Sequence, residues 1–391
     1  MSRGTMGMRV LVLCLVISLF GYAPQVRAAA TCDPPFAGID DWEIATPESV
    51  GMDPAGLCAL GAAYDADKGA NVHGIVVIRN GMLVFERYYR GMDSPIVGGY
   101  GYGATTFDPE SLHDLRSISK TITALVLGIA IDRGWVGSVD TPVLSFFPEH
   151  ADLRTPEKER ITLRHLLTMS QGLVWNEFIP WTDPRNNERH LFQSSDPYRY
   201  IFEQPVETAP GEKFVYSGGS AALIAAILLK QTGQGLDELA QKHLFDPLGV
   251  RSVQWSRQRG DGQPLAYAGL RMRSRDLAKI GQILLDHGRW HGSQVVSAGW
   301  VEAATASQIA TTALPSVIGY GYQIWRGRSL TDRNGWIQWF AGFGLGGQRL
   351  FVVPSLDLVV VVTAGLYTSS QQNWVPLAIL DRHILPATGP R

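Results

Sequence analysis

The chain has 391 residues, of which 45% are apolar and 18% are charged, and its formal net charge is −2. This length and apolar content are sufficient for a core in one large domain or two closely packed ones, and they exclude a disulfide-stabilised miniprotein, a collagen and a disordered regulator. The pI near 6.5 argues against nucleic acid as a partner, because phosphate contacts require a basic face.

The first thirty residues are typical of a secretory signal peptide. Arg3 and Arg9 precede an apolar run at 10–20 that is too short to span a bilayer, and alanines at 28–30 provide a small-residue cleavage site. We therefore expect a signal peptide at 1–30 and an exported domain at 31–391, periplasmic or secreted. An uncleaved anchor is the alternative. We expect no stable membrane insertion after the signal is removed, because no later run reaches about 18 apolar residues.

Export would place the cysteines in an oxidising compartment. Cys14 would leave with the signal peptide, and Cys32 and Cys58 would remain as an even pair. We expect a Cys32–Cys58 disulfide that holds the N-terminal arm, and two unpaired thiols are the alternative.

Strand patterns gather at the two ends of the mature chain. Segments 72–78 and 82–88 flank Asn80-Gly81, which supplies the positive φ angles of a tight hairpin turn. Pro354-Ser355 marks a second turn near the C-terminus. Four further strands are expected at 320–325, 336–340, 349–353 and 356–362.

The middle of the chain is mostly helical. Apolar periodicity and breaking residues predict helices at 121–132, from Thr162 onward, at 221–231, at 236–245, and after Ser274 as N-cap. The simplest assembly is an α+β fold. One antiparallel sheet would combine about 41–110 with 315–391, and a helical lobe at about 111–314 would be inserted between them.

Ser117 and Lys120 stand three residues apart at the start of the apolar helix, so they share one face of it. A serine hydroxyl becomes a good nucleophile when a neighbouring base accepts its proton. A lysine can act as that base if burial or nearby cations lower its pKa. The positive end of the helix dipole would favour charge that develops near Ser117. The Ser-x-x-Lys spacing alone is weak evidence, because it also arises by chance.

Two further segments strengthen this interpretation. Tyr216 follows the Pro210-Gly211 turn and stands just before a helix, and the glycine-rich segment 342–347 leads into a strand. Glycines allow a ligand to approach backbone N–H groups closely. Taken singly, a packed tyrosine and a flexible hairpin are the simpler interpretations.

In their order and spacing, the three segments resemble the serine β-lactamase and penicillin-recognising superfamily. That superfamily uses Ser-x-x-Lys, a Tyr-x-Asn or Ser-x-Asn element and a Lys-Thr-Gly-type strand. The sequence is most similar to the class C-like branch that includes esterases and 6-aminohexanoate-oligomer hydrolases, from about residue 41 to the last strands. The resemblance implies a β-lactamase-like fold and a serine hydrolase that works by two-step acyl transfer without a cofactor.

The resemblance also assigns roles to individual residues. It implies that Ser117 is the acylated nucleophile, that Lys120 is its proton partner, and that Tyr216 moves protons to the leaving group and from the deacylating water. The oxyanion hole would consist of the N–H groups of Ser117 and of Leu345, the residue after Gly344. Two preorganised donors matter because the loss of one costs about 10²–10³ in kcat.

Two departures from the superfamily pattern bear on the substrate. Gly218 stands where an asparagine is usual, and Gly342-Phe343-Gly344 replaces the cation and hydroxyl that hold a substrate carboxylate. We therefore expect a small carboxylic ester or a linear amide as substrate. A β-lactamase or D-amino-acid peptidase is the first alternative, if Arg271 or Arg326 supplies the missing cation. A non-catalytic binding or sensor module with the same pocket is the second.

Two tryptophans complete the expected site. Trp175 and Trp181 lie in a polar and aromatic stretch before Tyr216, where insertions in the superfamily line the acyl or leaving-group pocket, so we assign both a substrate-facing role. The sequence lacks Cys-x-x-Cys, His-Glu-x-x-His and Walker motifs, and we expect neither a metal nor a nucleotide.

Overall fold

The computed structural model describes residues 1–2, 33–96, 101–332 and 335–389. The expected signal peptide lies outside the described residues, and so does Cys32. Cys58 is disulfide-bonded. Within the described ranges, no helix combines the length and the apolar character needed to cross a bilayer.

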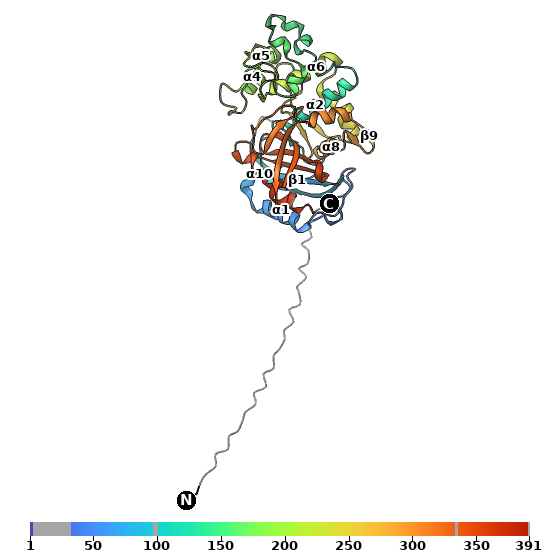
Figure 1. The fold of residues 1–391 in the computed structure, drawn as a ribbon, viewed down its shortest axis with the longest axis vertical. Helices are drawn as coiled ribbons and strands as arrows, with labels where there is room; N and C mark the ends of the chain where they lie inside the picture. Colours follow the sequence, from blue (N-terminus) through green and yellow to red (C-terminus); the bar gives the residue numbers. More distant parts are fainter. Residues whose placement is uncertain (3–32, 97–100, 333–334, 390–391) are drawn as a thin grey trace.

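Seven strands of the described chain form one antiparallel sheet that joins its two ends (Figure 1). The hairpin at Asn80-Gly81 is confirmed, with φ angles of 52° and 75°. Its first strand, β1, pairs with the last strand, β14, so that Val76 lies opposite Val361. In spatial order the strands are β10 (Val317–Tyr320), β11 (Trp325–Thr331), β12 (Gly335–Gly344), β13 (Gln348–Val353), β14 (Leu358–Ala364), β1 (Val72–Arg79) and β2 (Met82–Tyr88).

Helices cover both faces of this sheet, because alternate residues of each central strand point to opposite sides. Val76 belongs to the core shared with α2 and α8, whereas Ile75 belongs to the core shared with α1 and the C-terminal helices. The helices are α1 (Pro54–Ala66), α2 (Ile118–Asp132), α3 (Leu163–Leu167), α4 (Asn187–Gln193), α5 (Pro197–Glu203), α6 (Gly218–Thr232), α7 (Leu236–Ala240), α8 (Ser274–Leu285), α9 (Ala298–Thr305), α10 (Val375–Ala378) and α11 (Leu385–Ala387).

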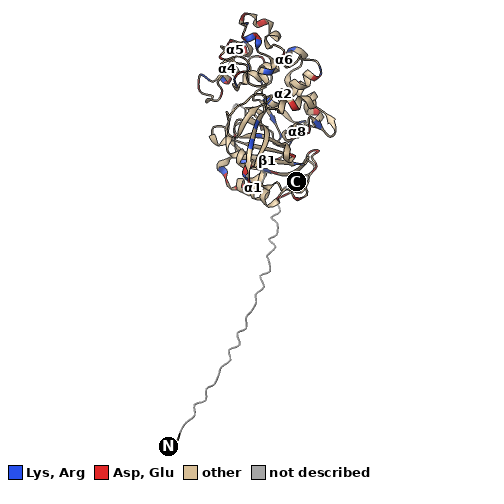
Figure 2. Cartoon of the chain, viewed as in Figure 1, with Lys and Arg blue, Asp and Glu red and all other residues tan. Residues whose placement is uncertain are grey.

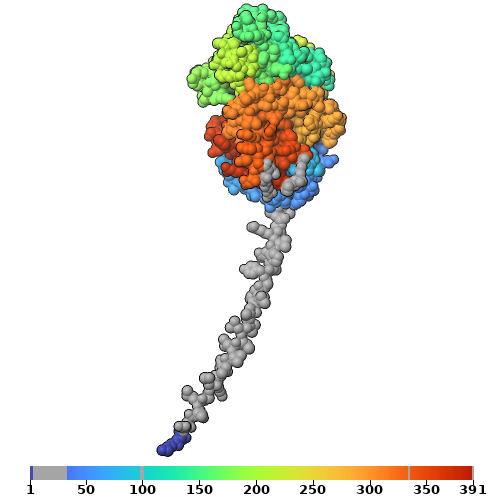
Figure 3. Space-filling model, in the orientation of Figure 1, coloured from blue at the N-terminus to red at the C-terminus, as the bar shows by residue number. Residues whose placement is uncertain are grey.

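Within the inserted segment, α4, α5 and α6 belong to a helical lobe at one end of the sheet, α8 packs against the sheet itself, and α2 lies between the two parts (Figure 1). In the space-filling view the lobe, drawn in green, continues directly into the sheet-containing body (Figure 3). Basic and acidic residues are intermixed along the chain (Figure 2). The smaller strands are β3 (Arg90–Asp93), β4 (Gly103–Thr106), β5 (His113–Asp114), β6 (Val253–Trp255), β7 (Leu270–Met272), β8 (Arg289–Trp290) and β9 (Ser293–Gln294).

The α+β fold with a sheet from both ends is confirmed, but one strand prediction was wrong. The expected strand at 320–325 is the turn between β10 and β11, closed by a hydrogen bond from Gly321 N–H to the Ile324 carbonyl, 2.8 Å. Gln323 has a φ of 57° and its side chain donates to the Leu166 carbonyl. The segment is apolar because this turn is buried, which sequence alternation does not distinguish from a strand.

Some helix ends also differ from expectation. The helix after residue 273 has Arg273 as N-cap and Ser274 as its first residue, and the Arg273 guanidinium pairs with Asp276. The helix expected at 236–245 is α-helical only to Ala240 and continues as a π-helical turn over Gln241–Phe245.

Candidate active site

The site forms where α2 begins. Ser117 is the N-cap of α2 and is partly exposed, whereas Lys120 is 1% exposed. Lys120 Nζ lies 3.0 Å from Ser117 Oγ and donates to the Tyr267 carbonyl, also at 3.0 Å. Two hydrogen bonds thus hold the Lys120 amine beside the partly exposed Ser117 hydroxyl, which a substrate can reach.

A buried polar residue in the first turn of α2 explains why this apolar helix begins at Ile118. The Ser119 hydroxyl donates to the Arg116 carbonyl, 2.7 Å, and accepts from the Leu270 N–H, 3.1 Å. Every residue from Ile118 to Ala130 is buried. A buried polar group needs a partner, and these bonds provide it while they attach the first turn of α2 to the neighbouring strand β7.

Arg116, directly before Ser117, has a φ of 51°, a conformation that costs a non-glycine residue energy. Three contacts of its guanidinium hold it there: the Ser94 carbonyl at 2.5 Å, Asp114 at 3.6 Å and the face of the Tyr367 ring at 4.6 Å. The backbone turn that presents Ser117 is therefore held by side chains from other parts of the fold.

Tyr216 lies against the same pair. Lys120 Nζ is 4.7 Å from the Tyr216 ring centre, and the Tyr216 hydroxyl interacts with both Ser117 and Lys120. The ring stacks between Phe178 at 5.1 Å and Trp325 at 5.4 Å. Burial raises the pKa of Tyr216, and the Lys120 charge opposes part of that rise. The structure thus brings together the three residues that the sequence selected.

Glu177 is a member of this site that sequence reasoning missed. Its side chain is 3% exposed and its Oε1 lies 3.7 Å from Lys120 Nζ. Its Oε2 accepts from the Gly218 N–H at 2.6 Å and from Trp175 Nε1 at 2.7 Å. A Cβ at position 218 would lie 3.3 Å from the same oxygen. The glycine that departs from the superfamily pattern therefore makes room for a carboxylate.

This carboxylate changes the expected protonation of Lys120. Burial disfavours the ammonium, but Tyr216, Glu177 and then Glu188 more than offset it and raise the pKa of Lys120 above its ordinary value. The condition stated for a lysine base, a lowered pKa, is therefore not met in the resting site, because the acidic neighbours outweigh burial. Burial and Glu177 raise the pKa of Glu188, in α4, to about 7.

The glycine-rich end of β12 lies beside the start of α2. A Cβ on Gly344 would lie 2.2 Å from the Leu115 carbonyl, and one on Gly342 would lie 3.1 Å from Ile118. Leu345 follows in the turn to β13 and is 47% exposed. Among the described residues, no backbone hydrogen bond is found from the N–H of Leu345 or of Ser117.

The two tryptophans occupy different environments. Trp175 is 7% exposed, belongs to the larger core, and supports Glu177 through its Nε1. Trp181 is 41% exposed and packs edge-on against Phe192, with ring centres 5.9 Å apart. Trp175 therefore contacts the site through Glu177, and Trp181 lies on the lobe surface.

The two arginines considered as carboxylate anchors have other partners. Arg271 Nε lies 2.7 Å from the buried Asp114, and its other nitrogens donate to Gln254 and the Leu112 carbonyl. Arg326 donates to the Thr305 carbonyl and to Gln338. Aromatic rings, by contrast, continue from Tyr216 through Trp325 to the half-buried Phe343, 5.7 Å further on.

The chain is similar to curated hydrolases. The chain is 26% identical over 292 residues to the 6-aminohexanoate-dimer hydrolase of Paenarthrobacter ureafaciens, covering 70% of this chain and 71% of that protein. It is 28% identical over 193 residues to the lovastatin esterase of Penicillium rubens, covering 43% and 45%.

The fold has clear relatives among solved structures. A putative beta-lactamase from Bacteroides dorei superposes with a TM-score of 0.66 at 19% identity, over 86% of this chain and 99% of that one. The Beta-lactamase family model matches residues 60–379. The β-lactamase-like fold is thereby confirmed, and the chain belongs to the beta-lactamase family of hydrolases.

Proposed function

We propose that this protein is an exported serine hydrolase that cleaves small carboxylic esters or linear amides through an acyl-enzyme on Ser117. One observation carries the proposal: a partly exposed serine at the start of a buried helix has a lysine amine 3.0 Å away and a tyrosine hydroxyl in reach of both. Export is part of the proposal on the strength of the N-terminal sequence.

The first half-reaction is acylation. Ser117 Oγ forms a bond to the substrate carbonyl carbon, and its proton passes to the Lys120–Tyr216 pair. The resulting oxyanion accepts hydrogen bonds from the N–H groups of Ser117 and Leu345. The tetrahedral intermediate collapses when the C–O or C–N bond breaks, and Tyr216 protonates the departing alcohol or amine.

The second half-reaction reverses these proton movements. Water attacks the acyl carbon and gives its proton to the Tyr216–Lys120 pair, the bond to Ser117 Oγ breaks, and Ser117 regains its proton. The acid product leaves. Both halves require the pair to hold one proton fewer than in its fully protonated form.

This requirement predicts the pH dependence. The pKa values of Lys120 and Tyr216 are both raised, so the fully protonated pair dominates at neutral pH. We expect kcat/KM to increase with pH into the alkaline range. The midpoint of this ascending limb of the pH–rate profile should lie above the ordinary lysine pKa. The Glu177→Gln variant removes the negative charge next to Lys120, lowers its pKa and should move that limb to lower pH by about one unit.

Glu188→Gln should move the limb in the same direction but less, because Glu188 has the weaker effect on Lys120. Glu203→Gln is the matched control, since Glu203 pairs with the exposed Arg199. The measurement is kcat/KM from mildly acidic to strongly alkaline pH. An unchanged limb in Glu177→Gln would contradict the role of this carboxylate.

Substrate class follows from the charges around Ser117. Phe343 stands where the superfamily has a carboxylate-binding hydroxyl, and Arg271 and Arg326 are held by other partners. The lost charged hydrogen bond is worth about 1.5–3 kcal/mol, or roughly 10–100-fold in rate. An apolar ester or amide has no carboxylate, so the absence of this hydrogen bond does not weaken its binding. It gains contact with the aromatic rings that run from Tyr216 to Phe343.

A substrate panel tests this assignment. We expect kcat/KM for p-nitrophenyl butyrate, or for p-nitrobutyranilide as an uncharged linear amide, to exceed that for nitrocefin by at least ~10-fold. Turnover of nitrocefin at a comparable kcat/KM would favour the β-lactamase alternative. Acylation of Ser117 without turnover of any of the three would favour the binding module.

A further inference from the structure

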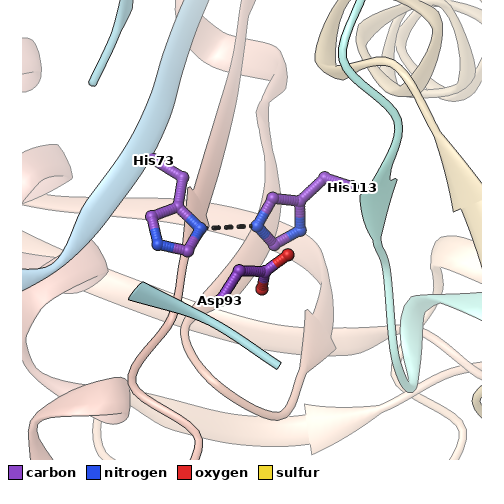
Figure 4. Close-up of side chains that lie close together, drawn as sticks. All are labelled: His73, Asp93 and His113. Atoms are coloured by element: carbon purple, nitrogen blue, oxygen red, sulfur yellow. Dashed lines mark hydrogen bonds between the residues drawn. The ribbon is translucent and has the colours of Figure 1, made fainter. Parts of the chain in front are cut away.

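Two histidines and an aspartate form a buried cluster that the acyl-transfer mechanism does not use (Figure 4). His73 lies in β1, Asp93 ends β3 and His113 begins β5, and they are 0%, 4% and 1% exposed. One nitrogen or oxygen from each lies within 4.8 Å of the others. Three strands that are separate in the sequence thus bring metal-ligating side chains to one point.

The outer nitrogens of both imidazoles face backbone carbonyls. His73 Nε2 lies 3.1 Å from the Met92 carbonyl oxygen, and His113 Nδ1 lies 3.0 Å from that of Asp114. A carbonyl oxygen only accepts, so each of these nitrogens carries a hydrogen and donates it. In a neutral imidazole the other nitrogen then has a lone pair and no hydrogen.

The inner nitrogens, His73 Nδ1 and His113 Nε2, face each other at 2.8 Å (Figure 4). Two neutral rings in these tautomers would direct lone pairs at one another, which is repulsive unless a cation lies between them. That cation is either a proton or a metal ion. The Asp93 carboxylate, whose ligand atom lies within 4.8 Å of a nitrogen of each ring, supplies the third ligand that a metal ion needs and a shared proton does not.

Asp93 supplies the anionic oxygen that such a site needs. The Tyr367 hydroxyl donates to Asp93 Oδ1 at 2.6 Å. Imidazoles whose outer N–H groups bond to carbonyls, beside a carboxylate held by a hydroxyl, match the way proteins orient the ligands of zinc.

The orientation of the His73 ring is also set by its neighbours. It stacks on Phe107 with ring centres 4.2 Å apart. A Cβ on Gly91 would lie 2.6 Å from the ring, and one on Gly365 would lie 2.7 Å from it. The backbone closes around this imidazole from two sides, so its orientation is set before any ion binds.

We propose that His73 Nδ1, His113 Nε2 and the Asp93 carboxylate bind one divalent transition-metal ion of the zinc type, with water as a further ligand. Zinc–nitrogen distances of ~2.0–2.1 Å at a tetrahedral angle require about 3.3 Å between the two nitrogens. The rings would therefore separate by roughly half an ångström on binding.

The ion would act on the structure behind the active site. Tyr367, which donates to Asp93, has the Arg116 guanidinium 4.6 Å from the centre of its ring. A Cβ on Gly346 would lie 2.5 Å from the same Tyr367 ring. Arg116 precedes Ser117, and Gly346 follows Leu345. An ion that ties β1, β3 and β5 together therefore steadies the backbone on both sides of the expected oxyanion hole.

The test uses the full chain, treated with a chelator, desalted, and then given Zn²⁺ or Co²⁺. We expect one ion per chain after a second desalting step, a rise in Tm of about 3 °C or more at saturation, and for Co²⁺ the visible spectrum of a four-coordinate site. Asp93→Asn keeps the shape of the side chain and should weaken binding at least ~10-fold.

His150→Gln is the control, because it removes another buried histidine, 5% exposed, outside the cluster. It should bind the ion like the wild type. The proposal is overturned if the wild type takes up no ion at micromolar Zn²⁺ and its Tm does not move, or if Asp93→Asn binds as tightly as the wild type. Stoichiometry and Tm are independent of acyl transfer, so a failure of the proposed hydrolase activity would leave this test intact.

Discussion

Replacement of Ser117 by alanine is expected to lower kcat by about 10⁴-fold or more toward the best ester substrate, with the fold retained. The reason is chemical: without Oγ no acyl-enzyme forms, and Lys120 and Tyr216 have no hydroxyl to deprotonate. The fold should persist because the first turn of α2 is held by Ser119 and not by the Ser117 side chain. Circular dichroism and Tm report on that part of the prediction.

A covalent label gives the most direct measurement. A fluorophosphonate should add one adduct to the wild-type chain by intact mass, and none to Ser117→Ala. Ser145→Ala, which changes an exposed serine on the lobe, should label like the wild type. Near-normal activity in Ser117→Ala would refute the nucleophile, and a folded wild type that takes no label would move the binding module ahead of the hydrolase.

The second large effect is expected for Tyr216→Phe. This variant keeps the ring that stacks between Phe178 and Trp325 and removes only the hydroxyl that interacts with Ser117 and Lys120. Loss of a general acid–base group lowers kcat by about 10²–10⁴-fold, and KM should change little.

Tyr320→Phe is the matched control for this variant. Tyr320 is 1% exposed and its ring lies edge-on to Tyr216, with centres 6.5 Å apart. Its hydroxyl has no part in the proposed proton transfers, so kcat should stay within a few-fold of the wild type. A Tyr216→Phe defect confined to KM would assign the hydroxyl to binding and contradict a role in proton transfer.

Local signals in the sequence were sufficient for the framework of the fold. The Asn80-Gly81 hairpin follows from backbone conformation alone, and the apolar period around Ile122 places α2 correctly to its end at Asp132. Its start was placed three residues late, because Ser119 and Lys120 interrupt the apolar pattern. Those residues are buried with partners from distant segments, which a periodicity argument does not include.

The electrostatics of the site could not be predicted in the same way. Glu177 stands 57 positions from Lys120 in a loop, and no spacing rule relates the two. Together with Tyr216 and Glu188, it reverses the direction of the Lys120 pKa shift that burial alone suggested. The only sequence clue was negative: Gly218 lacked the expected side chain, and the space it leaves is where the carboxylate oxygen lies.

The pairing of β1 with β14 has a consequence for how this protein comes to be made. This pair lies inside the sheet and places Val76 opposite Val361, so β1 cannot join the other strands until nearly the whole chain has been synthesised. Contacts so distant along the chain form slowly. A partly synthesised chain therefore lacks β14, which joins β13 to β1 in the sheet. Without that strand the turn at Leu345 cannot be positioned beside Ser117. Hydrolytic activity should thus appear only when the last strand is added, and a chain truncated before Leu358 should show none.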